Sequence, residues 1–126
     1  MAQLGFFLGS LGCLLGVAFG AFGAHALRNR FDAYSLGVFE TAVQYQFYHS
    51  LALLAAGVLL AQFPASMLVK SSIFLFVLGI LLFSGSLYLL SFTGLKWLGA
   101  ITPLGGLAFI AGWACLAAAG WQLLGH

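Results

Sequence analysis

The densest polar chemistry in the sequence lies in one short segment, which runs from Glu40 to His49. Because a helix turns about 100° per residue, most polar side chains of this segment fall on one half of a helix surface. They are Glu40, Thr41, Gln44, Tyr45, Tyr48 and His49. Such groups can bind a ligand or form a hydrogen-bond network, and they are costly to bury without partners. We therefore expect this face to point toward protein.

The spacing of the ionisable residues disfavours several specific chemistries. His25 and His49 differ in depth, and no third His, Cys or carboxylate joins them at a usual metal-ligand spacing. We therefore expect no metal site and no cofactor. The sequence also lacks a Ser-His-acid arrangement, a pair of catalytic carboxylates and a glycine-rich phosphate loop after a strand. An enzymatic function is less favoured than a non-enzymatic one.

The composition indicates a membrane protein. Of the 126 residues, 63% are hydrophobic and only 5% are charged, whereas about a quarter of a soluble domain is charged. A chain this short cannot hide so much apolar surface in water, so the excess must face lipid. A net charge of +2 from four Lys or Arg and two acidic residues offers no basic patch for nucleic acid.

Four apolar stretches are long enough to cross a bilayer, which takes about 20 residues. They run from about residue 4 to 27, 43 to 63, 72 to 92 and 98 to 124. After the first stretch, Phe31, Tyr34 and Val38 recur at helical spacing, which is typical of a short amphipathic helix on the membrane surface. The sequence predicts an all-α, integral membrane four-helix bundle in one domain, with this surface helix between spans one and two.

Polar residues of the later spans reach the same depth as His49 when residues are counted inward from one boundary. At about 1.5 Å per residue, they share a level near ~9 Å below the surface, and His25 lies closer to the boundary. The predicted polar pocket comprises His25, Glu40, Gln44, Tyr45, Tyr48, His49, Ser84, Ser86 and Thr102. Two interpretations stay open, a hydrogen-bond cluster that locks the bundle or a small pocket that opens to the cytoplasmic leaflet.

The few basic residues predict an orientation. An even number of spans places both termini on the face that carries Lys70, while Arg28, Arg30 and Lys96 share the opposite face. Cytoplasmic loops carry an excess of Lys and Arg. We therefore expect the loops after spans one and three in the cytoplasm and both termini outside it.

Glycines recur every three or four residues along the first span, and small residues recur on the fourth. The helix-packing candidates are Gly12, Gly16, Gly20 and Gly112. Small residues let two helix backbones approach closely, which favours association within lipid. The pattern leaves open whether this glycine zipper packs within one chain or between copies.

Four phrases resemble a known family. They are Gly20-Ala-Phe-Gly-Ala-His-Ala-Leu27, Glu40-Thr-Ala-Val-Gln-Tyr-Gln-Phe-Tyr-His-Ser-Leu51, Phe83-Ser-Gly-Ser-Leu-Tyr-Leu89 and Ile101-Thr-Pro-Leu-Gly-Gly106. The chain resembles the small membrane protein family of domain of unknown function 423, which includes transmembrane protein 256. The resemblance implies four spans and a bacterial inner-membrane location, and it implies no activity. The family's signature positions correspond here to Gly23, His25, Glu40, Gln44, Tyr45, His49, Ser84, Gly85, Ser86, Thr102, Pro103 and Gly106.

Three classes of function remain after these exclusions. The leading hypothesis is a non-enzymatic accessory or structural membrane component. The alternative is a binder or conduit for a small molecule, lipid or ion that uses the polar layer around His49, and the third is a membrane enzyme or redox protein. Membrane lipids are the expected partners, with other membrane proteins or a second copy of the chain left open.

Overall fold

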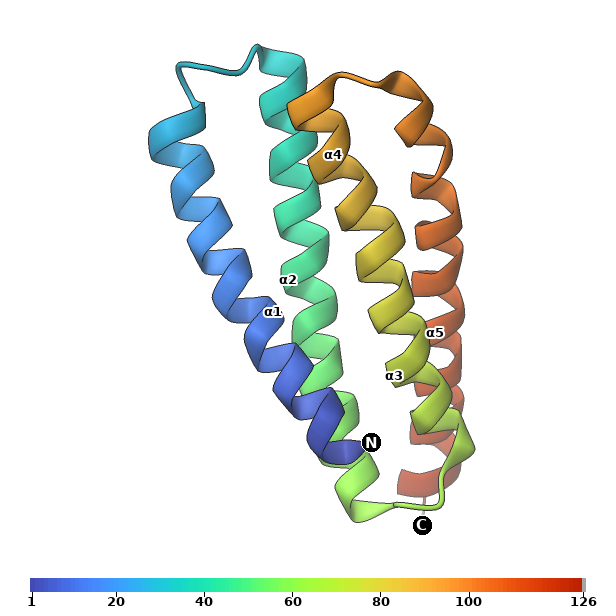
Figure 1. The fold of residues 1–126 in the computed structure, drawn as a ribbon. Coiled ribbons are helices and arrows are strands. Elements are labelled where there is room, and N and C mark those ends of the chain that lie inside the picture. The colour runs from blue at the N-terminus through green and yellow to red at the C-terminus, as the bar shows by residue number, and fades with distance from the viewer. Residues whose placement is uncertain (126) are drawn as a thin grey trace.

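A computed structural model describes residues 1–125, which form four long helices lying side by side (Figure 1). The first helix is α1 (Ala2–Phe22), which continues into a π-helical turn, η1 (Gly23–Leu27), and the second is α2 (Ala33–Gln62). The third consists of α3 (Met67–Gly79), the π-helical turn η2 (Ile80–Ser84) and α4 (Gly85–Thr93). The fourth joins a 3₁₀ turn, η3 (Lys96–Ala100), to α5 (Thr102–Leu124).

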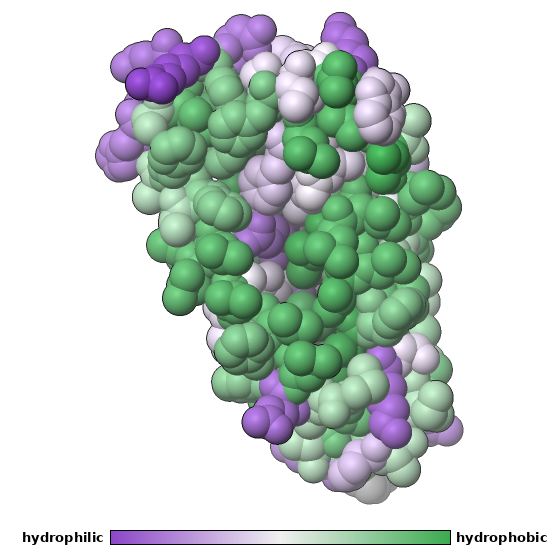
Figure 2. All heavy atoms as spheres, in the orientation of Figure 1, coloured by the Kyte–Doolittle hydropathy of each residue, from purple (hydrophilic) through white to green (hydrophobic). Residues whose placement is uncertain are grey.

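All four helices are long and apolar enough to cross a membrane, which confirms the predicted all-α membrane fold. Figure 2 shows the same division on the surface. Hydrophilic residues gather at the two ends, and hydrophobic residues cover most of the surface between them. The helices pack in chain order, since α1 contacts α2, α2 contacts the α3–η2–α4 helix, and the latter contacts α5.

The segment predicted as a separate surface helix is instead the first part of α2, which starts at Ala33 and runs unbroken through this region. Asp32 caps this start, because its Oδ1 accepts a 2.7 Å hydrogen bond from the backbone N–H of Ser35. That bond lowers the pKa of the Asp32 carboxyl. No proline follows Asp32 before the end of α2, so nothing separates the amphipathic segment from the span.

The predicted glycine face of α1 lies against α2 of the same chain. A methyl group added at Gly9 would lie 2.7 Å from the backbone oxygen of Ser50, so the two backbones are in close contact there. The same face continues through Gly12, which meets the Ser50 side chain, Gly16, which meets Phe47, and Gly20, which meets Val43. These positions form the glycine seam of the α1–α2 pair.

The α3–α5 contact is built differently, because Gly79 and Gly112 each receive a phenylalanine ring. A methyl group at Gly112 would lie 2.8 Å from the ring of Phe76, and Gly79 receives the ring of Phe109 in the same way. Both rings are buried. This aromatic packing forms the main hydrophobic core together with Leu53, Ala56, Leu60, Val69 and Ile73 of α2 and α3.

Candidate membrane-embedded binding site

Gln46 links three helices near the middle of the bundle. Its Nε2 donates a 2.8 Å hydrogen bond to the backbone oxygen of Gly12 on α1, and its Oε1 accepts a 2.5 Å hydrogen bond from the Tyr88 hydroxyl on α4. The Gly12 oxygen can only accept, which fixes the orientation of the amide. One N–H of Gln46 therefore remains without a partner in this cluster.

Ser50 lies one helical turn beyond Gln46 and holds a second unused hydrogen-bonding group. Its side chain is fully buried, and its Oγ is a buried polar atom with no hydrogen-bond partner among the described residues. A buried hydroxyl without a partner costs about 1 to 3 kcal/mol. The second N–H of Gln46 and the hydroxyl of Ser50 are thus both unpaired within the membrane span, and the Ser50 side chain lies against Gly12 of α1.

A cavity of about 310 Å³ adjoins these donors, between α1 on one side and η2 and α4 on the other. Figure 2 shows hydrophilic atoms at the base of a hollow in the otherwise hydrophobic surface between α1 and α4. The walls are mainly aliphatic, and Leu11, Leu15 and Leu81 are exposed at the outer side of the molecule. The polar residues of the lining are Gln46, Ser50, Ser84 and Tyr88. The cavity therefore opens toward lipid and has its polar groups at the inner end.

The π-helical turn η2 borders the same cavity. The N–H of Gly85 bonds the backbone oxygen of Ile80, five residues earlier, which widens the helix locally. Ser84 ends this turn and donates a 2.8 Å hydrogen bond to the backbone oxygen of Ala42 on α2. Gly85 has open space at its Cα, since the nearest atom to an added methyl group would be 3.9 Å away. Widened helical turns occur frequently at functional sites.

His49 faces away from this cavity and lies among aromatic rings of α3 and α5. Its ring stacks on Phe109 with centroids 3.5 Å apart. Its Nδ1 lies 2.7 Å from the backbone oxygen of Tyr45, and its Nε2 accepts a 3.0 Å hydrogen bond from Trp113. Because the Tyr45 oxygen can only accept, Nδ1 carries the proton and the ring is the neutral tautomer. Both ring nitrogens are therefore used within the chain.

The predicted polar pocket is thus divided among separate places. His49 does not hydrogen-bond Ser84, Ser86 or Thr102, because its two nitrogens are occupied by Tyr45 and Trp113. Ser86 and Thr102 do meet, with 2.7 Å between their hydroxyl oxygens. Tyr45 stays beside His49, since their rings stack with centroids 6.1 Å apart, and the ring of Tyr48 lies 5.8 Å from that of Tyr45. The remaining predicted residues lie on exposed surface; these are His25, Glu40 and Gln44.

The reason for this division is visible in the buried stripe of α2. The buried positions follow alternating steps of three and four residues: Phe39, Ala42, Gln46, His49, Leu53, Ala56 and Leu60. Gln46 lies on this stripe, whereas Gln44 and Tyr48 lie beside it. The sequence reasoning followed the polar half of the helix and missed Gln46, Ser50, Tyr88 and Trp113. The apolar three-four spacing was the signal that could have found Gln46.

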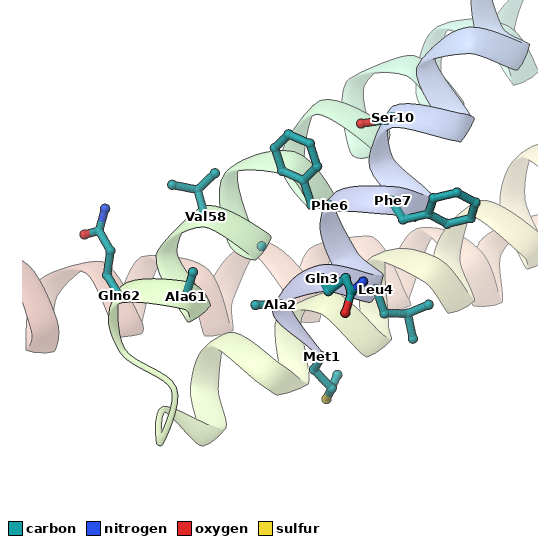
Figure 3. A pocket seen from close by; sticks show the side chains of 11 residues that line it. Met1, Ala2, Gln3, Leu4, Phe6, Phe7, Ser10, Val58, Ala61 and Gln62 are labelled. Atoms are coloured by element: carbon teal, nitrogen blue, oxygen red, sulfur yellow. The ribbon is translucent and has the colours of Figure 1, made fainter.

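Other features offer weaker sites. A hollow of about 940 Å³ lies between the start of α1 and the end of α2 (Figure 3), but its polar amides, Gln3 and Gln62, lie on opposite sides of it. Within residues 1–125, no three His, Cys, Asp or Glu side chains gather into a group that could hold a metal ion. The cavity beside Gln46 is the site with converging polar groups.

The fold and this site define a small four-span membrane protein with a lipid-facing cavity. Residues 19–106 match the family model described as "Protein of unknown function (DUF423)". The chain belongs to this family, as the resemblance in sequence implied.

Named relatives agree with the membrane location. A UPF0382 membrane protein of Staphylococcus saprophyticus is 47% identical over 86% of this chain and 89% of its own. The UPF0382 membrane protein YwdK of Bacillus subtilis is 44% identical over 93% of this chain and 95% of its own. The UPF0382 inner membrane protein YgdD of Escherichia coli is 43% identical over 79% of this chain and 76% of its own. No solved structure matches the chain.

Proposed function

We propose that this protein binds a lipophilic molecule from the bilayer in the cavity between α1 and the η2–α4 part of the third span. The observation that carries the proposal is the pairing of an aliphatic, lipid-facing cavity of about 310 Å³ with an unpaired N–H of Gln46. Apolar pockets with a few placed polar groups are the usual form of small-molecule sites.

The chemistry of the lining supports binding without a reaction. Amide, hydroxyl and phenol groups recognise a ligand by hydrogen bonding, and the lining contains no His, Cys, Lys, Arg, Asp or Glu. A general base or an activated nucleophile needs such a residue within hydrogen-bond reach. The proposed role of the cavity is therefore to hold or present its ligand.

Filling the cavity tests this proposal. Gly85→Leu places a side chain in the cavity without a close contact, because its nearest neighbour lies 3.9 Å from an added methyl group. Gly120→Leu is a matched control, since Gly120 is also helical and has open space at its Cα. The proteins are purified in nanodiscs formed directly from cell membranes and studied by native mass spectrometry.

We expect the unchanged protein and Gly120→Leu to retain a lipophilic adduct that Gly85→Leu loses. Equal retention in all three proteins would place the adduct elsewhere and overturn the proposal. Recovery of a partner protein without any lipophile would instead favour the accessory-subunit hypothesis.

We further propose that both termini lie outside the cytoplasm. The arrangement of the helices supports this orientation, since the loop with Arg28 and Arg30 lies at the same end as Lys96, opposite the termini (Figure 1). Cysteines introduced at Arg30 and Gly125 should react from opposite sides in a background in which Cys13 and Cys115 are serine. An impermeant reagent should reach only the Gly125 site in intact cells. Labelling of the Arg30 site alone would reverse the orientation.

A further inference from the structure

The depth of Gln46 limits which part of a ligand can reach it. Gln46 follows the start of α2 at Ala33 by 13 residues and precedes its end at Gln62 by 16. At about 1.5 Å per residue, these intervals are ~20 Å and ~24 Å along the helix. The hydrocarbon core is about 30 Å thick, which is shorter than this helix. Because the charged Glu40 precedes Gln46 by only six residues, Gln46 lies inside the core within ~9 Å of the boundary on that side. The charged phosphate group of a phospholipid stays in the headgroup region, outside this level.

The lining also limits the charge of the ligand. The cavity contains no charged side chain that could pair with an ion. An unpaired charge is costly at this depth in the membrane. The polar group that meets Gln46 is therefore uncharged.

The unused donor beside the cavity favours a ligand that carries a hydrogen-bond acceptor. Gln46 already uses its oxygen toward Tyr88 and one N–H toward Gly12, which leaves its second N–H as a donor. The Ser50 hydroxyl, one turn away on the same helix, also has no partner, but it is fully buried against Gly12 of α1, where a ligand does not reach it. Donors left unpaired in hydrocarbon carry a free-energy cost that an acceptor on the ligand removes.

We infer that the cavity takes an uncharged lipophile with a carbonyl oxygen, which accepts a hydrogen bond from the second N–H of Gln46 within the hydrocarbon core. Its apolar chain would lie along Leu8, Leu11 and Val77, which line the same cavity. This inference rests on the proposed function, and it adds the chemical class of the ligand.

Three photoreactive alkyl probes of equal length test the inference in nanodiscs that contain the full chain. One carries a ketone, one carries no polar group and one carries a carboxylate, and each has the same diazirine in its chain. The readout is the yield of crosslinks to peptides that line the cavity. A neutral hydrogen bond is worth about 0.5 to 1.5 kcal/mol. We therefore expect the ketone to label about 2 to 13 times more than the hydrocarbon, and the carboxylate least.

Gln46→Leu should lower ketone labelling to the level of the hydrocarbon probe. Gln44→Leu is its matched control, because the same change falls on an exposed position of the same helix, and it should leave the ketone preference unchanged. The comparison of probes on the unchanged protein stands even if Gln46→Leu fails to insert.

The outcomes separate this inference from the proposed function. Equal labelling by ketone and hydrocarbon, blocked in both cases by Gly85→Leu, would overturn the inference and retain the lipophile site. Strongest labelling by the carboxylate would also overturn it. Failure of every probe to label the cavity would overturn the proposed function as well.

Discussion

Gln46 and His49 lie on the same buried stripe of α2, yet they face different halves of the molecule. His49 faces α3 and α5, where Phe109 covers its ring and both nitrogens have partners within the chain. Gln46 faces α1 and α4, where the amide bonds two helices and still keeps one free N–H beside a cavity. Both polar side chains link helices by hydrogen bonds, but of the two only Gln46 keeps an unused donor.

The difference suggests how polar residues divide their roles in a small membrane bundle. A polar group whose donors and acceptors are all used acts as a structural tie, because any ligand would have to displace an existing bond. A group with an unused donor next to open space gains free energy when a ligand supplies the acceptor. Burial alone does not distinguish the two, since Gln46 is 5% exposed and His49 is 4% exposed.

The largest effect is expected from Gly9→Leu, which tests whether the α1 side depends on close helix contact. The new side chain would meet the backbone of α2 at Ser50 and Leu54, which cannot move aside as a side chain can. We expect a loss of ~3 kcal/mol in unfolding free energy, the upper part of the usual range for overpacking. Reversible denaturation in mixed micelles measures it.

Two further glycines serve as comparisons for that experiment. Gly16→Leu should cost less than Gly9→Leu, because its nearest contact is the ring of Phe47. Gly37→Leu should cost least, because nothing lies within 4 Å of an added methyl group there. Equal stability of all three variants would show that the glycine seam does not hold α1.

His49→Leu should produce the next largest effect, and it tests the α5 side. It removes the acceptor of the Trp113 N–H and the stacked ring on Phe109. We expect a loss of ~2 kcal/mol in unfolding free energy, because a donor is left without its partner. His49→Gln keeps an acceptor and should lose less. Neither change should alter labelling of the cavity, and a strong loss of labelling would contradict the separation of the two sides.

Gln46→Leu should lower the unfolding free energy by ~1 kcal/mol, which is less than the loss expected for His49→Leu. The Gly12 oxygen keeps its bond within α1, so the main loss is the partner of the Tyr88 hydroxyl. The same denaturation measurement decides the order of the two variants. A larger loss for Gln46→Leu would mean that the Gln46 cluster is the main structural tie.

Ser50→Ala should have the smallest effect and the opposite sign. Removing a buried hydroxyl that has no partner should raise the unfolding free energy of the ligand-free protein by up to ~1 kcal/mol. Ser72→Ala is the matched control, because Ser72 is equally buried but donates a 2.7 Å hydrogen bond to the Val69 oxygen. A gain in stability from Ser72→Ala as large as that from Ser50→Ala would refute the role given to the unpaired hydroxyl.

The fold could largely be predicted from the sequence, because a long apolar stretch in lipid must form a membrane-spanning helix. The start of α2 was harder to predict. The amphipathic character of Phe31 to Val38 indicated a helix on the membrane surface, but character alone does not say where one helix ends and the next begins. Asp32 carries the cap that begins α2, and no breaker follows it before the end of the span.

The candidate site could be predicted only in part. The depth of a residue along its helix can be counted from the sequence, but the direction of its side chain around the helix depends on the neighbouring helices. Ser84 was predicted to lie in the polar layer, and it does border the cavity. The partner of His49 was not predictable from depth, since Trp113 reaches it from α5. Gln46 was overlooked because it lies among apolar positions of the stripe, whereas Gln44 shares a face with other polar residues.

The glycine seam also has a consequence for biosynthesis. The spans that it joins are neighbours in the chain, and α1 packs almost entirely on α2. A contact between neighbouring segments closes only a short loop, so it forms early and at a small entropic cost. The first two spans can therefore leave the insertion machinery as a packed hairpin while the third is still being synthesised. The Ser84 and Tyr88 side of the cavity is then added to a surface of α1 and α2 that already exists.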